Sequence, residues 1–204
     1  VSVENTNGVT DLAANAFSYC TSLTGIDFPD LRQVTGNPFF HCTSLHTVTS
    51  PLTSEDGRCL VDDKGTLASF IPGGLTEYTM PENITSIGVS AFSEVCNLVS
   101  LNMSDSVTSI EQNAFYGCSS LESVTFSSNL EVIGRYAFDG CNNLKSVTLP
   151  SSIRLIEEHA FQGCHNMAYM MCYAPVPPCL SESGDPYYNG LNGLEPDRIM
   201  ILVP

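Results

Sequence analysis

Apolar residues recur along the chain at a step of 23 residues, and each recurrence brings the same residue types to the same places. Four Ala-Phe pairs, from Ala91-Phe92 to Ala160-Phe161, follow one another at this step. Six residues after each Phe stands a Leu or Met, and another aliphatic residue or Met follows three positions later. A unit this short cannot bury its apolar residues alone, so the pattern predicts stacked repeats. The phenylalanines of the predicted buried ladder are Phe17, Phe39, Phe92, Phe115, Phe138 and Phe161.

Within a unit, two kinds of local pattern predict two elements. Apolar Val124 and Phe126 alternate with polar Ser123 and Thr125, which is typical of a short, half-buried strand. The segment 133–138, followed by Gly140, predicts about one helical turn ended by a left-handed glycine. The predicted fold class is therefore an α/β solenoid of the leucine-rich-repeat type. It has about seven coils, each with one short parallel strand in a seven-rung sheet and one helical turn.

One coil is longer than the others, because Tyr78 follows the equivalent Val48 after 30 residues. Two apolar runs inside this coil flank Asp62-Asp63-Lys64-Gly65, which predicts a β-hairpin that replaces the helical turn and projects from the surface. After Met170 the repeat ends, and solenoid ends need a cover. We expect a single domain over 1–204, with N-terminal coils at 1–51, the longer coil at 52–79, regular coils at 80–170 and a C-terminal cap at 171–204. No covering segment precedes the first coil, so we expect the native chain to extend upstream.

The motif Ile-x-x-x-Ala-Phe-x-Gly-Cys-x-x-Leu-x-x-Val-x-Leu-Pro, at 133–150, resembles the BspA-type leucine-rich repeat. Segment 55–72 resembles the hairpin variant of that family, and 172–178 with 201–204 resembles the C-terminal segment seen in anaerobic gut bacteria. The resemblance covers nearly the whole chain. It implies a secreted or surface-anchored protein, since several members are regarded as adhesins for host matrix proteins or other bacteria. It implies no catalytic residues.

Charge and hydropathy narrow the possible partners. Only 7 Lys and Arg stand against 22 Asp and Glu, a net charge of −15. A chain this acidic is repelled by nucleic acid and by anionic membrane surfaces, so we expect neither as a partner. No apolar run approaches the ~18 residues of a membrane span. The expected location is extracellular or at the cell surface.

Nine cysteines are present, and five of them stand three residues after a repeat Phe. A small residue at that place is typical of a core position, so we expect free, buried thiols. Disulfides are the alternative, with Cys172 and Cys179 as the best candidate pair. The cysteines of the predicted ladder are Cys20, Cys42, Cys118, Cys141 and Cys164.

Motifs of catalysis and metal binding are missing from the sequence. There is no Cys-x-x-Cys pair, no Gly-x-Ser-x-Gly elbow, no His-Glu-x-x-His and no glycine-rich phosphate loop. The closest groupings are His41-Cys42 with His46, and His159 with Cys164-His165, and their cysteines belong to the ladder. We therefore expect no enzyme activity, no cofactor and no metal.

Binding is the remaining expectation. Outward-facing strand positions are mainly Ser and Thr, whereas interface anchors are usually aromatic or Arg. Aromatic residues gather near the C-terminal end, so the predicted partner contacts are Tyr169, Met171, Tyr187 and Tyr188, with the 55–72 hairpin as an alternative. These aromatics could instead pack the cap. The predicted function is a cell-surface or secreted leucine-rich-repeat module that binds a protein or glycan, as in protein–protein or host-matrix adhesion. A passive spacer or scaffold within a larger surface protein is the rival, and an enzyme is disfavoured.

Overall fold

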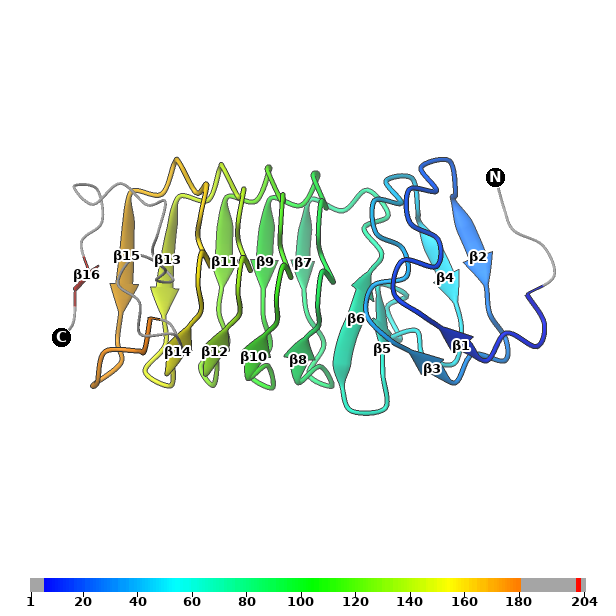
Figure 1. The fold of residues 1–204 in the computed structure, drawn as a ribbon, viewed down its shortest axis with the longest axis horizontal. Helices are drawn as coiled ribbons and strands as arrows, with labels where there is room; N and C mark the ends of the chain where they lie inside the picture. The colour runs from blue at the N-terminus through cyan, green and yellow to red at the C-terminus, as the bar shows by residue number, and fades with distance from the viewer. Residues whose placement is uncertain (1–5, 181–200, 203–204) are drawn as a thin grey trace.

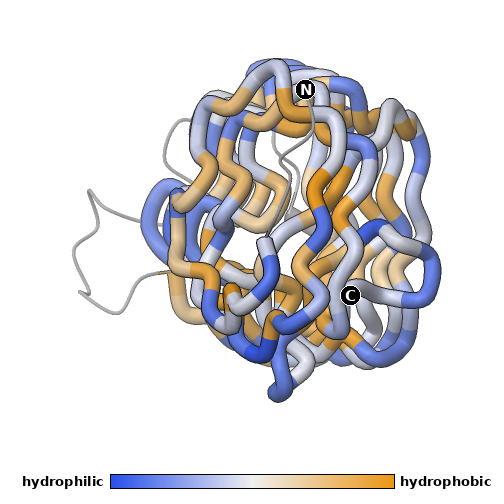
Figure 2. Tube along the Cα trace, turned by 90° about the vertical axis from the view of Figure 1, so that its right-hand side faces the viewer, coloured by the Kyte–Doolittle hydropathy of each residue, from blue (hydrophilic) through white to orange (hydrophobic). Residues whose placement is uncertain are grey.

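The computed structural model describes residues 6–180 and the strand at 201–202. The coils stack along one axis into an elongated solenoid, with the N-terminal coils at one end and β15 (Tyr169–Cys172) near the other (Figure 1). Figure 2 looks along this axis, and residues of like hydropathy lie behind one another from coil to coil. The predicted solenoid is confirmed.

Two ladders of short parallel strands run along the C-terminal part of the solenoid. Neighbouring coils pair in one register, so that Val124 lies beside Leu101 and Ile110 beside Ile133. The first sheet contains β7 (Glu77–Thr79), β9 (Ser100–Asn102), β11 (Ser123–Thr125), β13 (Ser146–Leu149), β15 and β16 (Ile201–Leu202). The second contains β5 (Cys59–Val61), β6 (Thr66–Phe70), β8 (Ser86–Ile87), β10 (Ser109–Ile110), β12 (Val132–Ile133) and β14 (Leu155–Ile156).

The predicted helical turn in each coil is wrong, because the described residues contain no helix. Its first residues form the second strand, and the rest is a chain of tight turns. The N–H groups of Asn113, Phe115 and Gly117 donate to carbonyls of the next coil, while those of Tyr116 and Cys118 donate three residues back. A helix directs all its N–H groups along its own axis, whereas here alternate groups point sideways to the neighbouring coil. Gly117, with a left-handed φ of 70°, ends the run of turns in its coil, as expected.

The predicted seven-rung sheet is divided in two. The first coils form separate two-stranded sheets, in which β1 (Asp11–Leu12) pairs with β3 (Gln33–Val34) and β2 (Gly25–Asp27) pairs with β4 (Thr47–Thr49). Between them and β7 lies the hairpin of β5 and β6 (Figure 1). Strand β6 continues the second sheet through Leu67 and Ile87, but no strand of this coil joins β4 to β7 in the first sheet.

The prediction that this hairpin projects from the surface is also wrong. Leu67 and Phe70 pack in the core of the C-terminal coils, whereas Leu60 and Ala68 pack in the core of the N-terminal coils. Both faces of the hairpin are therefore buried, because each faces a separate apolar cluster. Consecutive apolar residues are typical of a strand covered on both sides.

Aromatic rings form the centre of the C-terminal core. Phe70 of the hairpin stacks on Phe92 with ring centroids 4.5 Å apart, and Phe92 continues to Phe115 at 4.8 Å. The stack then runs through Phe138 to Phe161, whose rings are 5.2 Å apart. In the N-terminal core, Phe17 stacks on Phe39 at 5.6 Å, with Phe17 only half-buried.

Candidate functional site

A hollow on the surface lies at the coil of the hairpin, here called the irregular coil. Its segment from the second strand to the stacked Phe is shorter than in a regular coil. In a regular coil five residues separate strand residue Ile110 from Phe115. In the irregular coil, Leu67 takes the strand place beside Ile87, and Phe70 reaches the aromatic stack only three residues later. Strand β6 continues to Phe70, whereas the equivalent strands of the regular coils, such as β10, have two residues and are followed by a run of turns. The irregular coil lacks the run of turns that its neighbours make at this place.

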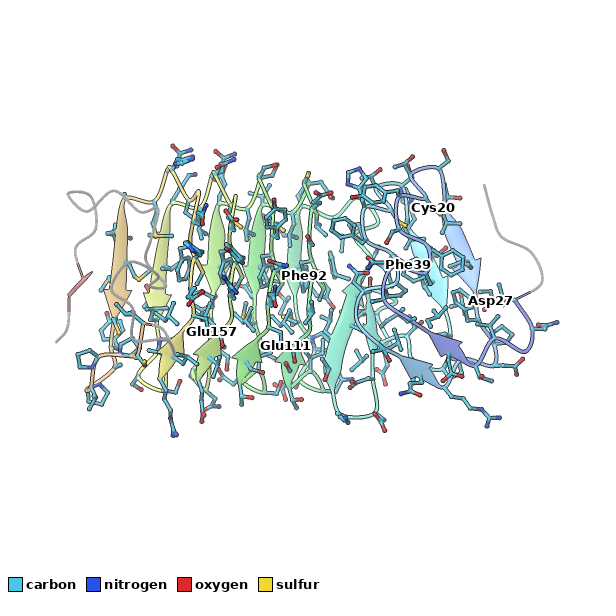
Figure 3. All side chains as sticks on the ribbon, in the orientation of Figure 1. Cys20, Asp27, Phe39, Phe92, Glu111 and Glu157 are labelled. Atoms are coloured by element: carbon cyan, nitrogen blue, oxygen red, sulfur yellow. The ribbon has the colours of Figure 1, made fainter. Side chains whose placement is uncertain are left out.

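The hollow is a cleft of about 430 Å³. Its walls are segments of the two flanking coils, 37–46 on one side and 91–97 on the other. Phe70, Pro72 and Gly74 of the irregular coil also line it. Figure 3 marks Phe39 and Phe92, which belong to the coils on the two sides of this interruption. The cleft therefore follows the route that a regular coil would take.

Where the cleft interrupts the stack, only some of the cross-coil hydrogen bonds of the regular ladder have a substitute. Regular coils make three cross-coil backbone bonds here, such as those donated by Asn113, Phe115 and Gly117. Between the coils that flank the cleft, the Asn37 side-chain amide donates to the Ser90 carbonyl at 2.8 Å. Phe70 N–H, from the irregular coil, donates to the Ala91 carbonyl at 2.9 Å. These two bonds hold the inner part of the cleft together.

The third position is left open. The N–H of His41 and the carbonyl of Ser93 occupy the repeat positions that pair as Gly117 and Asp139 elsewhere. Neither group makes a hydrogen bond to another described residue. One backbone donor and one backbone acceptor of the ladder are therefore unpaired at this place among the described residues.

The side chains of His41 and of Glu94, the residue after Ser93, bridge the two walls. Nδ1 of His41 contacts Oε2 of Glu94. Both residues occupy the place of the left-handed glycine and have φ of 58° and 59°. Replacement of the glycine by Tyr19, His41 and Glu94 predicts looser turns in these coils, and this prediction is wrong, because all three residues keep the left-handed conformation of the glycine. A side chain at such a φ costs conformational energy that glycine avoids.

An aromatic patch lies beside the cleft. Tyr19 is 65% exposed and packs edge-on against Phe40 at 5.5 Å and against the His41 ring at 5.1 Å. Tyr116, which is 40% exposed, lies on the other side of Ser93. A second hollow of about 280 Å³ lies between Phe40 and Tyr116 and adjoins the cleft at Ser93. We call Tyr19, Phe40, His41 and Tyr116 the aromatic patch.

The sequence shows each aromatic residue of this patch but not that they meet. Phe40 and Tyr116 share one place of the repeat, directly after the repeat Phe, and Tyr19 and His41 share the next. Because the irregular coil lacks this segment, coils that are not consecutive become neighbours. The cluster could have been found by comparing residues at equivalent positions of the aligned repeats, instead of by their separation along the chain.

The predicted partner contacts at the C-terminal end are placed only in part. Tyr169 and Met171 lie on β15 in register with Ser146 and Thr148, Tyr169 is 44% exposed and Met171 is half-buried. Their strand also pairs with β16. Tyr187 and Tyr188 lie outside the described residues, so the proposed contact at this end stays a prediction.

Most cysteines of the ladder are buried, and their thiols donate hydrogen bonds to backbone carbonyls. Cys42, Cys118 and Cys164 each donate to a phenylalanine carbonyl in a neighbouring coil, at 3.0 to 3.2 Å. The expectation for Cys20 is wrong, because it is exposed at the N-terminal end (Figure 3). None of the nine cysteines, all within the described residues, is in a disulfide, and Cys172 is buried whereas Cys179 is exposed. Burial raises the pKa of Cys164 to about 12, so that thiol is not a nucleophile near neutral pH.

No group of His, Cys, Asp and Glu in the described part of the chain could hold a metal ion. Within the same residues there is no helix of the length and hydropathy that a bilayer span requires. Among the described residues that line the cleft there is no Lys or Arg, and the one carboxylate is that of Glu94. The arrangement is suited to contact with another molecule through apolar surface, hydroxyl and amide groups and one carboxylate.

Six copies of the BspA type leucine-rich repeat region match residues 1–57 and 68–173. The chain belongs to this family. The matched region leaves out the core of the hairpin, where the repeat is interrupted. No curated protein matches the chain.

Solved structures share the fold. A leucine-rich cell surface protein from Faecalibacterium prausnitzii is 27% identical with a TM-score of 0.66, over 83% of this chain and 52% of that one. The leucine-rich repeat protein TpLRR of T. pallidum is 25% identical, with a TM-score of 0.54, over 78% of this chain and 72% of its own. The pneumococcal vaccine antigen PcpA is 23% identical with a TM-score of 0.71 over 80% and 42%, and shows the fold alone. This chain spans about half the length of the F. prausnitzii protein.

Proposed function

We propose that the chain is a binding module displayed on a bacterial surface or secreted, and that it contacts a protein through the cleft and the aromatic patch. The observation that carries the proposal is the exposed ring of Tyr19, packed against the half-buried rings of Phe40 and His41 beside a cleft. Exposed aromatic residues at a concave surface are typical anchors of protein interfaces. Family membership and a neighbour described as a cell surface protein support the location.

Adhesion to host matrix is the specific form of this function that we propose to test. The double variant Tyr19→Ser, Tyr116→Ser removes the two most exposed rings of the patch. Tyr169→Ser removes a ring of comparable exposure, 44% against 40% for Tyr116, from the opposite end, and tests the alternative contact predicted there. We expect the wild type to bind at least one protein of a purified host matrix panel by surface plasmon resonance. The double variant should bind at least tenfold more weakly, as expected for loss of two anchors.

Two other results have different meanings. If Tyr169→Ser weakens binding and the double variant does not, the contact lies at the C-terminal end of the solenoid, where Tyr169 and Met171 are the proposed contacts. If the wild type binds no member of the panel, the adhesion proposal is wrong.

A passive spacer is the second candidate. The observation that favours it is the strand face of β9, β11 and β13, whose exposed residues are small and hydroxylated or amidic, such as Asn102, Thr125 and Thr148. A face of this kind has no anchor side chains. A spacer predicts that the double variant and the wild type behave alike in every binding assay.

A further inference from the structure

We infer that the cleft binds an extended, cationic peptide segment of the partner, which completes the interrupted ladder between His41 and Ser93. This inference rests on the proposed function, because it names the kind of partner that the same surface takes. Three features of the cleft carry it: its shape, its open backbone groups and its charge.

Shape comes first. In every regular coil the space equivalent to the cleft is filled by polypeptide, namely the segment that follows the repeat Phe. The irregular coil lacks this segment, and its residues Phe70, Pro72 and Gly74 line the cleft instead. The vacant route follows the length of wall 37–46 and wall 91–97. It is therefore shaped for an extended chain that runs parallel to the coils.

The unpaired backbone groups of His41 and Ser93 would form hydrogen bonds to the main chain of an inserted segment. The His41 N–H can donate to a carbonyl of an inserted segment, and the Ser93 carbonyl can accept from an N–H on the segment's other edge. A strand inserted between them would restore the cross-coil pairing that Gly117 makes with Asp139 elsewhere. Addition of a strand to open main-chain groups is a common mode of peptide recognition, in which the backbone supplies affinity and side-chain pockets supply specificity.

The floor supplies a pocket. Phe39, Phe70, Ala91 and Val95 line the cleft and are themselves almost fully buried, so it is chiefly the segment's own apolar side chain that would lose contact with water there. Removal of apolar surface from water stabilises such a contact.

Charge selects the peptide. Glu94 lies at the cleft with its side chain 28% exposed, none of the described residues that line the cleft is Lys or Arg, and the whole chain carries −15. A Lys or Arg of the segment can replace the contact of His41 with the Glu94 carboxylate. Long-range attraction to the acidic surface also favours a cationic segment over an anionic one.

The probe is a phage library of random dodecapeptides selected against the wild-type protein. We expect selected sequences that combine Lys or Arg with an apolar residue, and synthetic copies serve for titration. Thr43→Trp fills the cleft from its exposed wall, whereas Asn142→Trp places the same ring at the equivalent repeat position without a cleft. The first variant should weaken peptide binding at least tenfold and the second should leave it within twofold.

Two further titrations test the backbone and the charge separately. Methylation of successive peptide nitrogens should weaken binding about tenfold at the one that donates to Ser93 and spare its immediate neighbours, because one hydrogen bond is lost and its acceptor left unpaired. Glu94→Gln should weaken binding up to about fivefold at low salt and less at high salt.

The inference is overturned if selected peptides are anionic or free of Lys and Arg, if both Trp variants bind alike, or if methylation at every nitrogen has the same small effect. If matrix proteins bind Thr43→Trp as well as the wild type, the cleft is not their site, although the proposed function stands. Loss of all matrix binding in the wild type contradicts the proposed function instead.

Discussion

The thiol of Cys141 donates a hydrogen bond of 3.2 Å to the backbone carbonyl of Phe115, one coil earlier in the stack. The same carbonyl accepts the N–H of Cys118, so two cysteines meet at one oxygen. The cysteine at this place of the repeat is therefore more than a small apolar residue, because it links consecutive coils. Cys20 has no described coil before it, and it is exposed.

Replacement by alanine should lower the free energy of unfolding more at the buried Cys141 than at the exposed Cys20. Cys141→Ala removes a buried sulfur and one hydrogen bond, so we expect the free energy of unfolding to fall by about 1–2 kcal/mol. Cys20→Ala should change it by less than about 0.5 kcal/mol, as is typical of exposed sites. Urea titrations under reducing conditions measure both. Equal losses would show that the buried and exposed thiols do not differ as described.

Alkaline pH should destabilise the protein through the same thiols. Burial raises the pKa of Cys59 and of Cys164 from 9.0 to about 12. Above pH 9 the unfolded chain releases these protons while the native state keeps them, so the stabilisation present below pH 9 is lost as pH rises toward 12. Each thiol should lower the free energy of unfolding by about 1.4 kcal/mol per pH unit.

Denaturant titrations between pH 8.5 and 10 test this slope. The double variant Cys59→Ala, Cys164→Ala should lose stability less steeply than the wild type, by up to about 2.8 kcal/mol per pH unit. Cys20→Ala is the control, since its thiol is exposed. Parallel slopes for all three proteins would contradict the assigned burial.

Asn37 should be the most sensitive polar residue at the junction of the two cores. Its side chain donates to the Ser90 carbonyl and accepts from Phe39 N–H and the Ser69 hydroxyl, and it is 7% exposed. Asn37→Ala leaves these groups without partners, which should cost about 2–4 kcal/mol. Asn142→Ala, at an exposed site, should cost less than about 0.5 kcal/mol in the same thermal or urea unfolding experiment. Similar costs would mean that Asn37 does not hold the junction.

Repetition made the core predictable. Each position of the unit recurs several times, so the places of Phe115, Phe138 and Leu144 followed from the register alone, and all three are fully buried. The helical turn was mistaken because periodicity of so short a segment does not reveal where its N–H groups point. They point to the next coil, which local sequence does not encode.

The irregular coil was located correctly but not its surroundings. Its length and its Asp/Gly turn indicated a hairpin, and Cys59 to Val61 with Thr66 to Phe70 form one. Burial of both faces was indicated by the consecutive apolar residues Cys59, Leu60 and Val61. Phe70 follows Leu67 after three residues, two fewer than between the equivalent residues of a regular coil, and the cleft depends on this difference. Its walls come from coils about fifty residues apart in the sequence. Only the spatial arrangement brings them together.

A comparison of Phe138→Ala with Thr148→Ala tests the shared register of the coils most directly. The Phe138 ring is fully buried between Phe115 and Phe161, at 4.8 and 5.2 Å, whereas Thr148 faces solvent on β13. In a urea titration Phe138→Ala should lower the free energy of unfolding by about 3–5 kcal/mol, and Thr148→Ala by less than about 1 kcal/mol. Equal losses would contradict the stacked core on which the cleft and its proposed partner depend.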